Sequence, residues 1–411
     1  MDLNAGKVYW KETFKEHRTY PILEEDLSCD VCIVGSGSSG AHCAYFLAET
    51  GLNVVLIDKR DISEGSTVAN TGLLQYSNDK TLTSLIHSFG EDVGTRHVQL
   101  CLNAIRTLEK EVVPSLEENP DFKIRKSLYY ASSLEDVSML REEYDNLKSR
   151  DFPVEYYTEK DIESKFSFSK LAALVTANDA EINPYKHAHF LIEKAYQKGV
   201  RVYSNTKING KILKKNQTQL FTENGHMVRA QSVIFATGYE AQEEVRDKNA
   251  MILSSYAIAT NQIADQAKWH DDMMIWETAR PYLYARKTFD NRIIIGGLDE
   301  STKYLEKRDS MIIHKRDELL NQLNILFPEL EHRIQADYYW GAFFGETHDG
   351  LPTIGIYPDH PNCYFLLGYG GNGTVYSVIL SQIIRDLITK GGHPDSALYL
   401  KERNLSKSIV H

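Results

Sequence analysis

The chain has few cysteines, no long apolar run and no excess of positive charge. Its 411 residues include five cysteines, too few for a small secreted fold held by disulfides. No apolar run reaches the roughly 18 residues of a transmembrane helix, and the first residues lack the apolar core of a signal peptide. A net charge of −11 argues against nucleic acid or an anionic membrane as the main partner. We therefore expect a cytoplasmic protein with no integral membrane association.

A metal site is not expected either. Cys29 and Cys32 have CxxC spacing, but Cys32 lies inside an apolar run, which favours a packed thiol over a ligand. His187 and His189 fall on a helix expected over 184–198. Their spacing of two residues directs them to different sides of that helix.

Residues 30–58 carry the strongest pattern in the chain. The apolar run Val31–Val34 predicts a buried strand, and Gly35, Gly37 and Gly40 follow it at the start of a predicted helix. A second apolar strand then ends at Asp58. This arrangement is the βαβ dinucleotide fingerprint. The glycines allow a tight turn, a close approach of the pyrophosphate and close packing of helix on strand, and the acid suits a ribose.

The fingerprint alone fits FAD and NAD equally, so other motifs must decide between them. A loop of small and hydroxyl residues, 64–74, follows the ribose acid directly. The apolar strand 232–235 ends in Ala236-Thr237-Gly238, as expected at the carboxyl edge of a doubly wound sheet. A second glycine turn at 370–374 opens a predicted helix over 375–388. Two helix N-termini at opposite ends of the chain suit one extended ligand, which favours FAD.

The remaining pattern predicts a second domain, since 411 residues are too many for one simple core. The region 84–147 is mostly helical in pattern, with a strand at 127–131, and a long helix is predicted over 308–330. Between them, 250–300 is rich in strand signals, at 251–259, 282–286 and 292–297. The predicted fold class is α/β (α+β overall): a Rossmann-like cofactor domain and a mainly antiparallel second domain.

These motifs, in this order, resemble the D-amino-acid-oxidase-like superfamily of FAD-dependent amine and amino-acid oxidoreductases. The segments Tyr20–Leu23 and Tyr284–Gly297 look most like the gamma-glutamylputrescine oxidase branch, beside glycine and sarcosine oxidases. The resemblance implies a discontinuous FAD-binding domain made of residues 1–80, 181–245 and 340–411. It also implies a substrate-binding domain made of residues 81–180 and 246–339.

The resemblance also implies which residues lie at the cofactor. Noncovalent FAD is expected, because residues 340–344 read Trp-Gly-Ala-Phe-Phe where covalent relatives carry a cysteine. Lys207 would meet the adenine through its backbone, and the turn at 371–374 would bond the flavin. The full expected set is Gly35, Ser36, Gly37, Ser38, Ser39, Gly40, Asp58, Lys59, Ser66, Thr67, Asn70, Thr71, Gly72, Lys207, Ala236, Thr237, Gly238, Gly371, Asn372, Gly373 and Thr374.

The implied reaction oxidises a C–N bond of an amine or amino acid to an imine by hydride transfer to the flavin. Arg286 and Tyr284 share a strand face, and an arginine fork there would suit a substrate carboxylate. Candidate pocket walls are Trp276, Tyr339 and Trp340, although core packing would explain them equally. Some relatives that use oxygen carry a lysine where this chain has Ile293–Ile295, so the electron acceptor stays open.

Two alternatives remain: a flavin dehydrogenase acting on a C–O or C–N bond with another acceptor, and a non-catalytic FAD-binding subunit. Neither the substrate nor the oligomeric state follows from the sequence.

Overall fold

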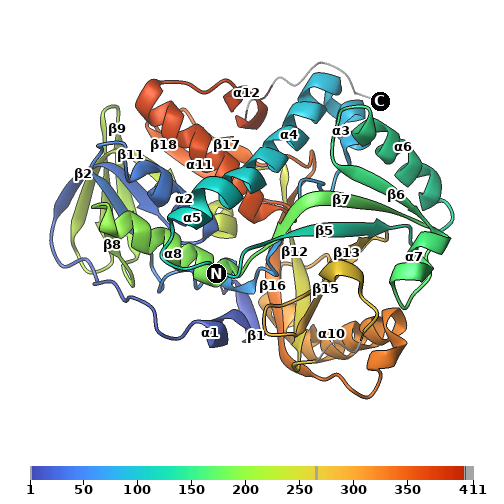
Figure 1. The fold of residues 1–411 in the computed structure, drawn as a ribbon. Coiled ribbons are helices and arrows are strands. Elements are labelled where there is room, and N and C mark those ends of the chain that lie inside the picture. The colour runs from blue at the N-terminus through green and yellow to red at the C-terminus, as the bar shows by residue number, and fades with distance from the viewer. Residues whose placement is uncertain (1, 264–266, 402, 404–411) are drawn as a thin grey trace.

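The computed structural model describes residues 2–263, 267–401 and 403, which form two sheets with helices around them (Figure 1). The first sheet is mainly parallel. Its strand order is β17 (Thr353–Gly355), β18 (Cys363–Leu367), β11 (Met227–Phe235), β2 (Leu27–Val34), β3 (Val54–Ile57) and β8 (Arg201–Tyr203). Strand β10 (Gln217–Thr222) pairs with β11 and with β9 (Ile208–Lys214). The strands β18, β11, β2, β3 and β8 run parallel to one another, so their carboxyl ends share one edge.

Side chains along β2 point alternately to the two faces of this sheet, and both faces are covered. Val31 and Ile33 pack with three helices on one face: α2 (Ser38–Leu47), α8 (Pro184–Gln197) and α11 (Gly373–Lys390). Cys32 points to the opposite face and packs with Leu23 and Leu220. All three β2 residues are almost fully buried. A strand buried on both faces reads as a continuous apolar run, which is why the sequence revealed it.

The second sheet is antiparallel except for one parallel pair, β13–β5. Its order is β1 (Asn4–Lys7), β16 (Ala336–Thr347), β12 (Ala250–Thr260), β15 (Ile293–Glu300), β14 (Leu283–Lys287), β13 (Met274–Glu277), β5 (Lys123–Tyr130), β7 (Ala172–Glu181) and β4 (Leu73–Leu74), with β6 (Val154–Thr158) beside β7. Helix α10 (Leu305–Leu326) covers one face, where Leu319 and Leu323 pack on Tyr256 and Ile258. The opposite face meets the cofactor-loop residue Val68 through Trp340.

The remaining helices close the molecule around these layers (Figure 1). Helix α4 (Glu91–Thr107) packs against α11 of the first sheet, and α6 (Asp136–Lys148) packs on β6 and β7. The shorter helices are α1 (Trp10–Thr13), α3 (Leu82–Phe89), α5 (Val113–Ser115), α7 (Glu159–Lys165), α9 (Ala241–Glu244) and α12 (Ser396–Tyr399). Single helical turns occur at η1 (Thr67–Ala69), η2 (Leu108–Val112), η3 (Gly238–Glu240), η4 (His270–Asp272) and η5 (Pro328–Leu330).

The predicted fold class is confirmed: a parallel, Rossmann-like sheet lies beside a mainly antiparallel one. The predicted domain segments follow the sheets less closely at their ends. Strands β1 and β4 lie within the predicted segment 1–80 but pair in the antiparallel sheet. Strand β16 crosses the predicted boundary at residue 340 and belongs to the antiparallel sheet as far as Thr347. The sheet to which each segment end belongs is set by strand pairing between distant segments. The residue pattern within one segment does not indicate its pairing partner.

Candidate functional site

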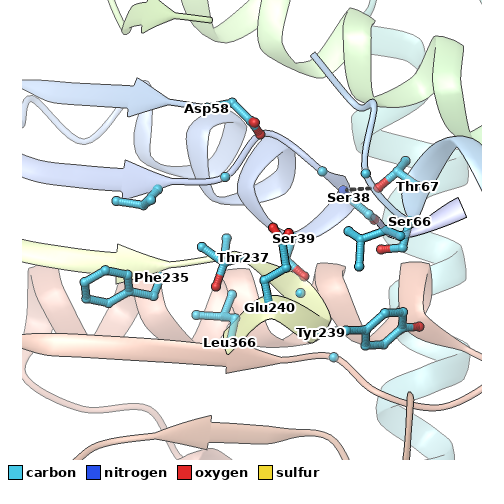
Figure 2. Close-up of a pocket in the computed structure, with 18 of the residues that line it drawn as sticks. Ser38, Ser39, Asp58, Ser66, Thr67, Phe235, Thr237, Tyr239, Glu240 and Leu366 are labelled. Atoms are coloured by element: carbon cyan, nitrogen blue, oxygen red, sulfur yellow. Dashed lines mark hydrogen bonds between the residues drawn. The ribbon is translucent and has the colours of Figure 1, made fainter. Parts of the chain in front are cut away.

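A cavity of about 370 Å³ opens at the carboxyl edge of the parallel sheet (Figure 2). Val34, Asp58, Phe235 and Leu366 bring the ends of β2, β3, β11 and β18 into its wall. This is the edge at which open α/β sheets bind their ligands.

The fingerprint loop has the geometry that its glycines predicted. Gly35 has a φ of +107°, and a Cβ there would lie 2.5 Å from the Ala236 carbonyl oxygen. A Cβ on Gly40 would lie 1.8 Å from the Gly35 carbonyl oxygen, so only glycine lets α2 start this close to β2. At the helix start, the Ser38 N–H donates to the Thr67 hydroxyl at 2.9 Å, the dashed line in Figure 2. The small-residue loop is thereby tied to the fingerprint.

Asp58 lies in the cavity wall, but protein donors already hold its carboxylate. Oδ2 accepts from the Ser36 N–H at 2.6 Å and the Ser36 hydroxyl at 2.7 Å, and Oδ1 accepts from the Arg60 N–H at 2.8 Å. Burial raises the pKa of Asp58, and these bonds oppose the rise. Because a carboxylate has about four acceptor positions, it retains capacity for one more donor. Its ribose role stays a prediction.

An ion bridge spans this cavity from β3 to β11. Glu240, after β11, accepts from Lys59 Nζ at 2.8 Å and from Arg60 Nη2 at 2.9 Å, and all three residues line the cavity. Burial opposes ionisation of Glu240, but the bonds from Arg60 and Lys59 outweigh it and lower its pKa to about 2. Figure 2 shows Glu240 in the middle of the cavity. No sequence motif indicates this bridge, because its partners lie about 180 residues apart in the chain.

A second cavity, of about 130 Å³, adjoins the first, and the two share Ser66, Asn70, Tyr239 and Gly373 in their walls. It lies between the small-residue loop, the turn at 370–373 and the antiparallel sheet. Of the expected cofactor residues, all but Ser36, Gly40 and Gly72 line one of the two cavities. Ser36 and Gly40 instead shape the fingerprint loop, and Gly72, at φ +77°, lies against the Ile182 carbonyl. The contact of each residue with a cofactor stays a prediction.

The turn before α11 is partly occupied by protein contacts. The Gly371 N–H donates to Asp79 Oδ2 at 2.8 Å, and the Asn372 amide donates to the Ser77 carbonyl and to Asn78 Oδ1. Gly373 and Thr374, at the first turn of α11, line the first cavity. The positive end of the helix dipole therefore lies at the cavity wall, whereas these Gly371 and Asn372 donors are engaged.

Arg286 and Tyr284 are separated by the structure. Tyr284 lines the second cavity, but Arg286 is 3% exposed and lines a different cavity near the N-terminus. Its guanidinium donates to the carbonyls of Thr71 at 2.8 Å and Ile182 at 2.9 Å, and lies 3.4 Å from Glu181. Burial lowers the pKa of Arg286. The expected pairing of both residues on one substrate is therefore corrected: Arg286 fixes the loop that carries Thr71.

The second cavity contains groups that sequence reasoning missed. Asp79 and Asp299 line it with Trp276, Tyr282 and Tyr284. Burial, with a contribution from Asp79, raises the pKa of Asp299 to about 6 against the bond from Ser255. Burial and the same two carboxylates raise the pKa of nearby Glu346 to about 7. The sequence analysis assigned no role to Asp79, and Asp299 falls just after the predicted strand 292–297.

The residues present fit an extended dinucleotide. The Ser38 hydroxyl is buried and without a partner in the described chain, and it lines the first cavity at the start of α2. In the second cavity, the Trp276 N–H and the Gln75 amide nitrogen are also buried without partners among the described residues. Buried polar atoms are normally satisfied, so these atoms indicate a ligand in both cavities.

Two further properties of the described ranges 2–263, 267–401 and 403 concern membranes and metals. None of their helices is both long and apolar enough to cross a membrane. Within the same ranges, no group of three or more His, Cys, Asp or Glu side chains is placed to hold a metal ion.

Comparison with known proteins agrees with this geometry. The model of the family described as FAD dependent oxidoreductase, DAO, matches residues 30–387. A Bacillus subtilis protein described as a putative Rieske 2Fe-2S iron-sulfur protein, YhfW, is 25% identical over 97% of this chain and 76% of its own. Gamma-glutamylputrescine oxidoreductase of Escherichia coli is 22% identical over 92% and 88%. The crystal structure of glycine oxidase from Geobacillus kaustophilus has a TM-score of 0.75 at 18% identity and covers 93% of this chain and 100% of that one.

Proposed function

The chain belongs to the FAD-dependent oxidoreductase family DAO, and on that premise we propose that it oxidises the C–N bond of an amine or amino acid to an imine, using noncovalently bound FAD. FAD is implied by the family, and when bound it supplies the hydride acceptor. The amine or amino-acid substrate is supported by the likeness to proteins named gamma-glutamylputrescine oxidoreductase and glycine oxidase.

The observation that carries the proposal is the pair of adjoining cavities. The first is lined by Gly35, Gly37 and Ser38 at the N-terminus of α2, and by Gly373 and Thr374 at the N-terminus of α11. Helix N-termini attract negative charge. The α2 end would hold the pyrophosphate, and the α11 end would favour negative charge on a ring placed beside it. The second cavity leaves space for a small substrate next to that ring.

Noncovalent binding is supported by the residue types in the walls. Within the described part of the chain, neither cavity is lined by a cysteine or a histidine. The five cysteines are all buried outside both cavities. The described residues of these two walls therefore offer no thiol or imidazole for a flavin linkage.

The second cavity would exclude water and orient the substrate. Tyr282 and Trp276 are nearly buried and stand in its wall with Phe344. Removing water strengthens the electrostatic interactions of a bound substrate. No lysine lines this cavity among the residues that the structure describes, which favours an electron acceptor other than oxygen.

The visible absorption spectrum of the purified protein tests the proposal directly. We expect a flavin spectrum, release of the flavin by acid denaturation, and anaerobic bleaching by at least one member of a panel of amines and amino acids. Comparing reoxidation in air with reoxidation by an artificial acceptor then separates an oxidase from a dehydrogenase. A colourless protein rejects FAD, bleaching only by hydroxy acids rejects the C–N substrate, and flavin that no substrate bleaches favours a non-catalytic subunit.

A further inference from the structure

We propose that the second cavity is a cation site in which Asp299 binds an ammonium group of the substrate, so that the substrate is an amine without a carboxylate beside the reacting nitrogen. This inference rests on the proposed function and names its substrate class. It replaces the expectation of a carboxylate held by Arg286.

The first argument is an unpartnered acceptor. Asp299 Oδ1 is buried and has no hydrogen-bond partner among the residues described, and Asp299 lines the second cavity. A buried carboxylate oxygen without a donor is costly. A ligand that brings an N–H donor or a positive charge would remove that cost.

The second argument is the charge of the walls. Two carboxylates, Asp79 and Asp299, line the cavity, and no Lys, Arg or His side chain lines it in the described ranges. The cations that act on Asp299 are engaged elsewhere: Lys315 pairs with Glu300 and Glu318, and the exposed Arg280 donates to the carbonyls of residues 277–279 and of Asp79. Arg286 holds backbone carbonyls. A substrate carboxylate would therefore meet like charge and find no counter-charge in the cavity wall.

The third argument is the aromatic wall. Tyr282 packs against Trp276 with ring centroids 6.5 Å apart, and against Tyr284 with centroids 5.9 Å apart. All three rings line the cavity together with Asp299. The Arg280 guanidinium lies over the Tyr282 ring, 4.9 Å from its centroid, and Trp276 stacks on Tyr129 with centroids 3.7 Å apart. A ligand ammonium would therefore contact the ring surface that remains beside Asp299.

The two unpartnered donors in the same wall are compatible with this assignment. The Trp276 N–H and the Gln75 amide are uncharged. They suit a carbonyl oxygen and add no positive charge that would compensate a carboxylate. Burial is the main cause of the raised pKa of Asp299, about 6, and Lys315 and Arg280 only partly oppose it.

The test measures binding of tetramethylammonium to the holoenzyme by isothermal titration calorimetry. This ion has no nitrogen lone pair and no N–H, so it cannot be oxidised to an imine and does not titrate. Neutral tert-butanol and anionic pivalate are probes of similar shape. We expect tetramethylammonium to bind and the other two not to bind. In Asp299→Asn we expect about tenfold weaker binding, while the charge-matched surface variant Asp317→Asn on α10 binds as the wild type does.

A pH series separates loss of the charge from a change of shape. The wild-type affinity should fall as the pH drops from 7 to 5, and Asp299→Asn should show a flatter profile. Asp79, Glu346, Arg280 and Lys315 also act on Asp299 electrostatically, so Glu346→Gln is measured in parallel. Glu346→Gln should retain the part of the profile that centres near pH 6.

The outcome can contradict this inference without contradicting the proposed function. Unchanged affinity in correctly folded Asp299→Asn, or tighter binding of pivalate than of tetramethylammonium, overturns the cation site. Bleaching by α-amino acids alone would do the same and would leave C–N oxidation intact. A protein without flavin overturns the proposed function and, with it, this inference, whereas a flavoprotein that fails the calorimetric test overturns this inference alone.

Discussion

The two adjoining cavities are built in different ways. The first is formed largely by short motifs: a glycine turn, a hydroxyl-rich loop and helix N-termini, many of whose contacts come from the backbone. The second is formed largely by side chains that seven separate segments bring together, among them Asp79, Trp276, Tyr284 and Asp299. The first is therefore suited to a ligand of fixed shape, and the second sets which small molecule can enter.

The largest expected effect is on the first cavity, from Gly40→Ala. The new Cβ would lie 1.8 Å from the Gly35 carbonyl oxygen, so α2 must move away from the fingerprint turn. We expect a loss of about 3 kcal/mol in unfolding free energy and loss of bound flavin, measured by urea denaturation and by absorbance at purification. Gly392→Ala, whose Cβ would meet open space, should change neither. Normal flavin content in Gly40→Ala would contradict the view that backbone proximity builds this cavity.

Arg286→Lys tests whether the guanidinium supports the loop between the cavities or binds substrate. Lysine keeps the charge but loses the fork that holds the carbonyls of Thr71 and Ile182. We expect a loss of about 2 kcal/mol in unfolding free energy, since each lost hydrogen bond contributes about 1 kcal/mol. The exposed Arg141→Lys serves as control and should be neutral.

The competing outcome for Arg286→Lys is equally clear. Unchanged stability with a selective loss of affinity for carboxylate ligands would restore the substrate role predicted from the sequence. It would also mean that a residue outside the second cavity contributes to substrate specificity.

Glu240→Gln tests the ion bridge across the first cavity. Lys59 and Arg60 both donate to this carboxylate, and removing its charge weakens the link between β3 and β11. We expect flavin to dissociate about fivefold faster, since such pairs contribute about 1 kcal/mol at most. Stopped-flow dilution, followed by the rise in flavin fluorescence on release, measures this rate, and Glu306→Gln on α10 is the control. Slower release would mean that the bridge competes with the cofactor for the cavity.

The bridge also has a pH signature. The pKa of Glu240, about 2 in the folded protein, lies below its usual value near 4.3. Its stabilising contribution is therefore fully present above pH 4.3 and is lost as the pH falls toward 2.

The smallest expected effect on stability comes from the carboxylates at the second cavity. Its pH dependence is opposite to that of Glu240. Folding raises the pKa of Asp299 to about 6 and of Glu346 to about 7. Their contribution to stability is present below the unfolded value near 4 and is lost as the pH rises through 6 to 7. Glu346→Gln should therefore raise Tm at pH 8 by about 2 °C and leave Tm at pH 4 nearly unchanged, as thermal denaturation can show. An equal shift at both pH values would contradict an electrostatic cause.

The sequence predicted much of the fold because its strongest signals are local. Strand β2 is an apolar run buried on both faces, and α8 lies within one residue of its predicted range of 184–198. The family prediction is confirmed by the match over residues 30–387. Sheet membership near the predicted domain boundaries is not local, because β1, β4 and β16 join the antiparallel sheet through partners far away in the chain. The division into two domains stays a prediction.

What the sequence alone determined is the first cavity's fingerprint: the turn at Gly35, the close packing at Gly40 and the helix start behind them depend on a few consecutive residues and on backbone geometry. Only the tertiary structure decided where Arg286 points and which charges meet in the second cavity. Arg286 turned to the carbonyls of Thr71 and Ile182, more than 100 residues away. Asp79 and Asp299 came together because strand register and sheet packing place them at one wall. The charge of that wall is therefore a property of non-local packing.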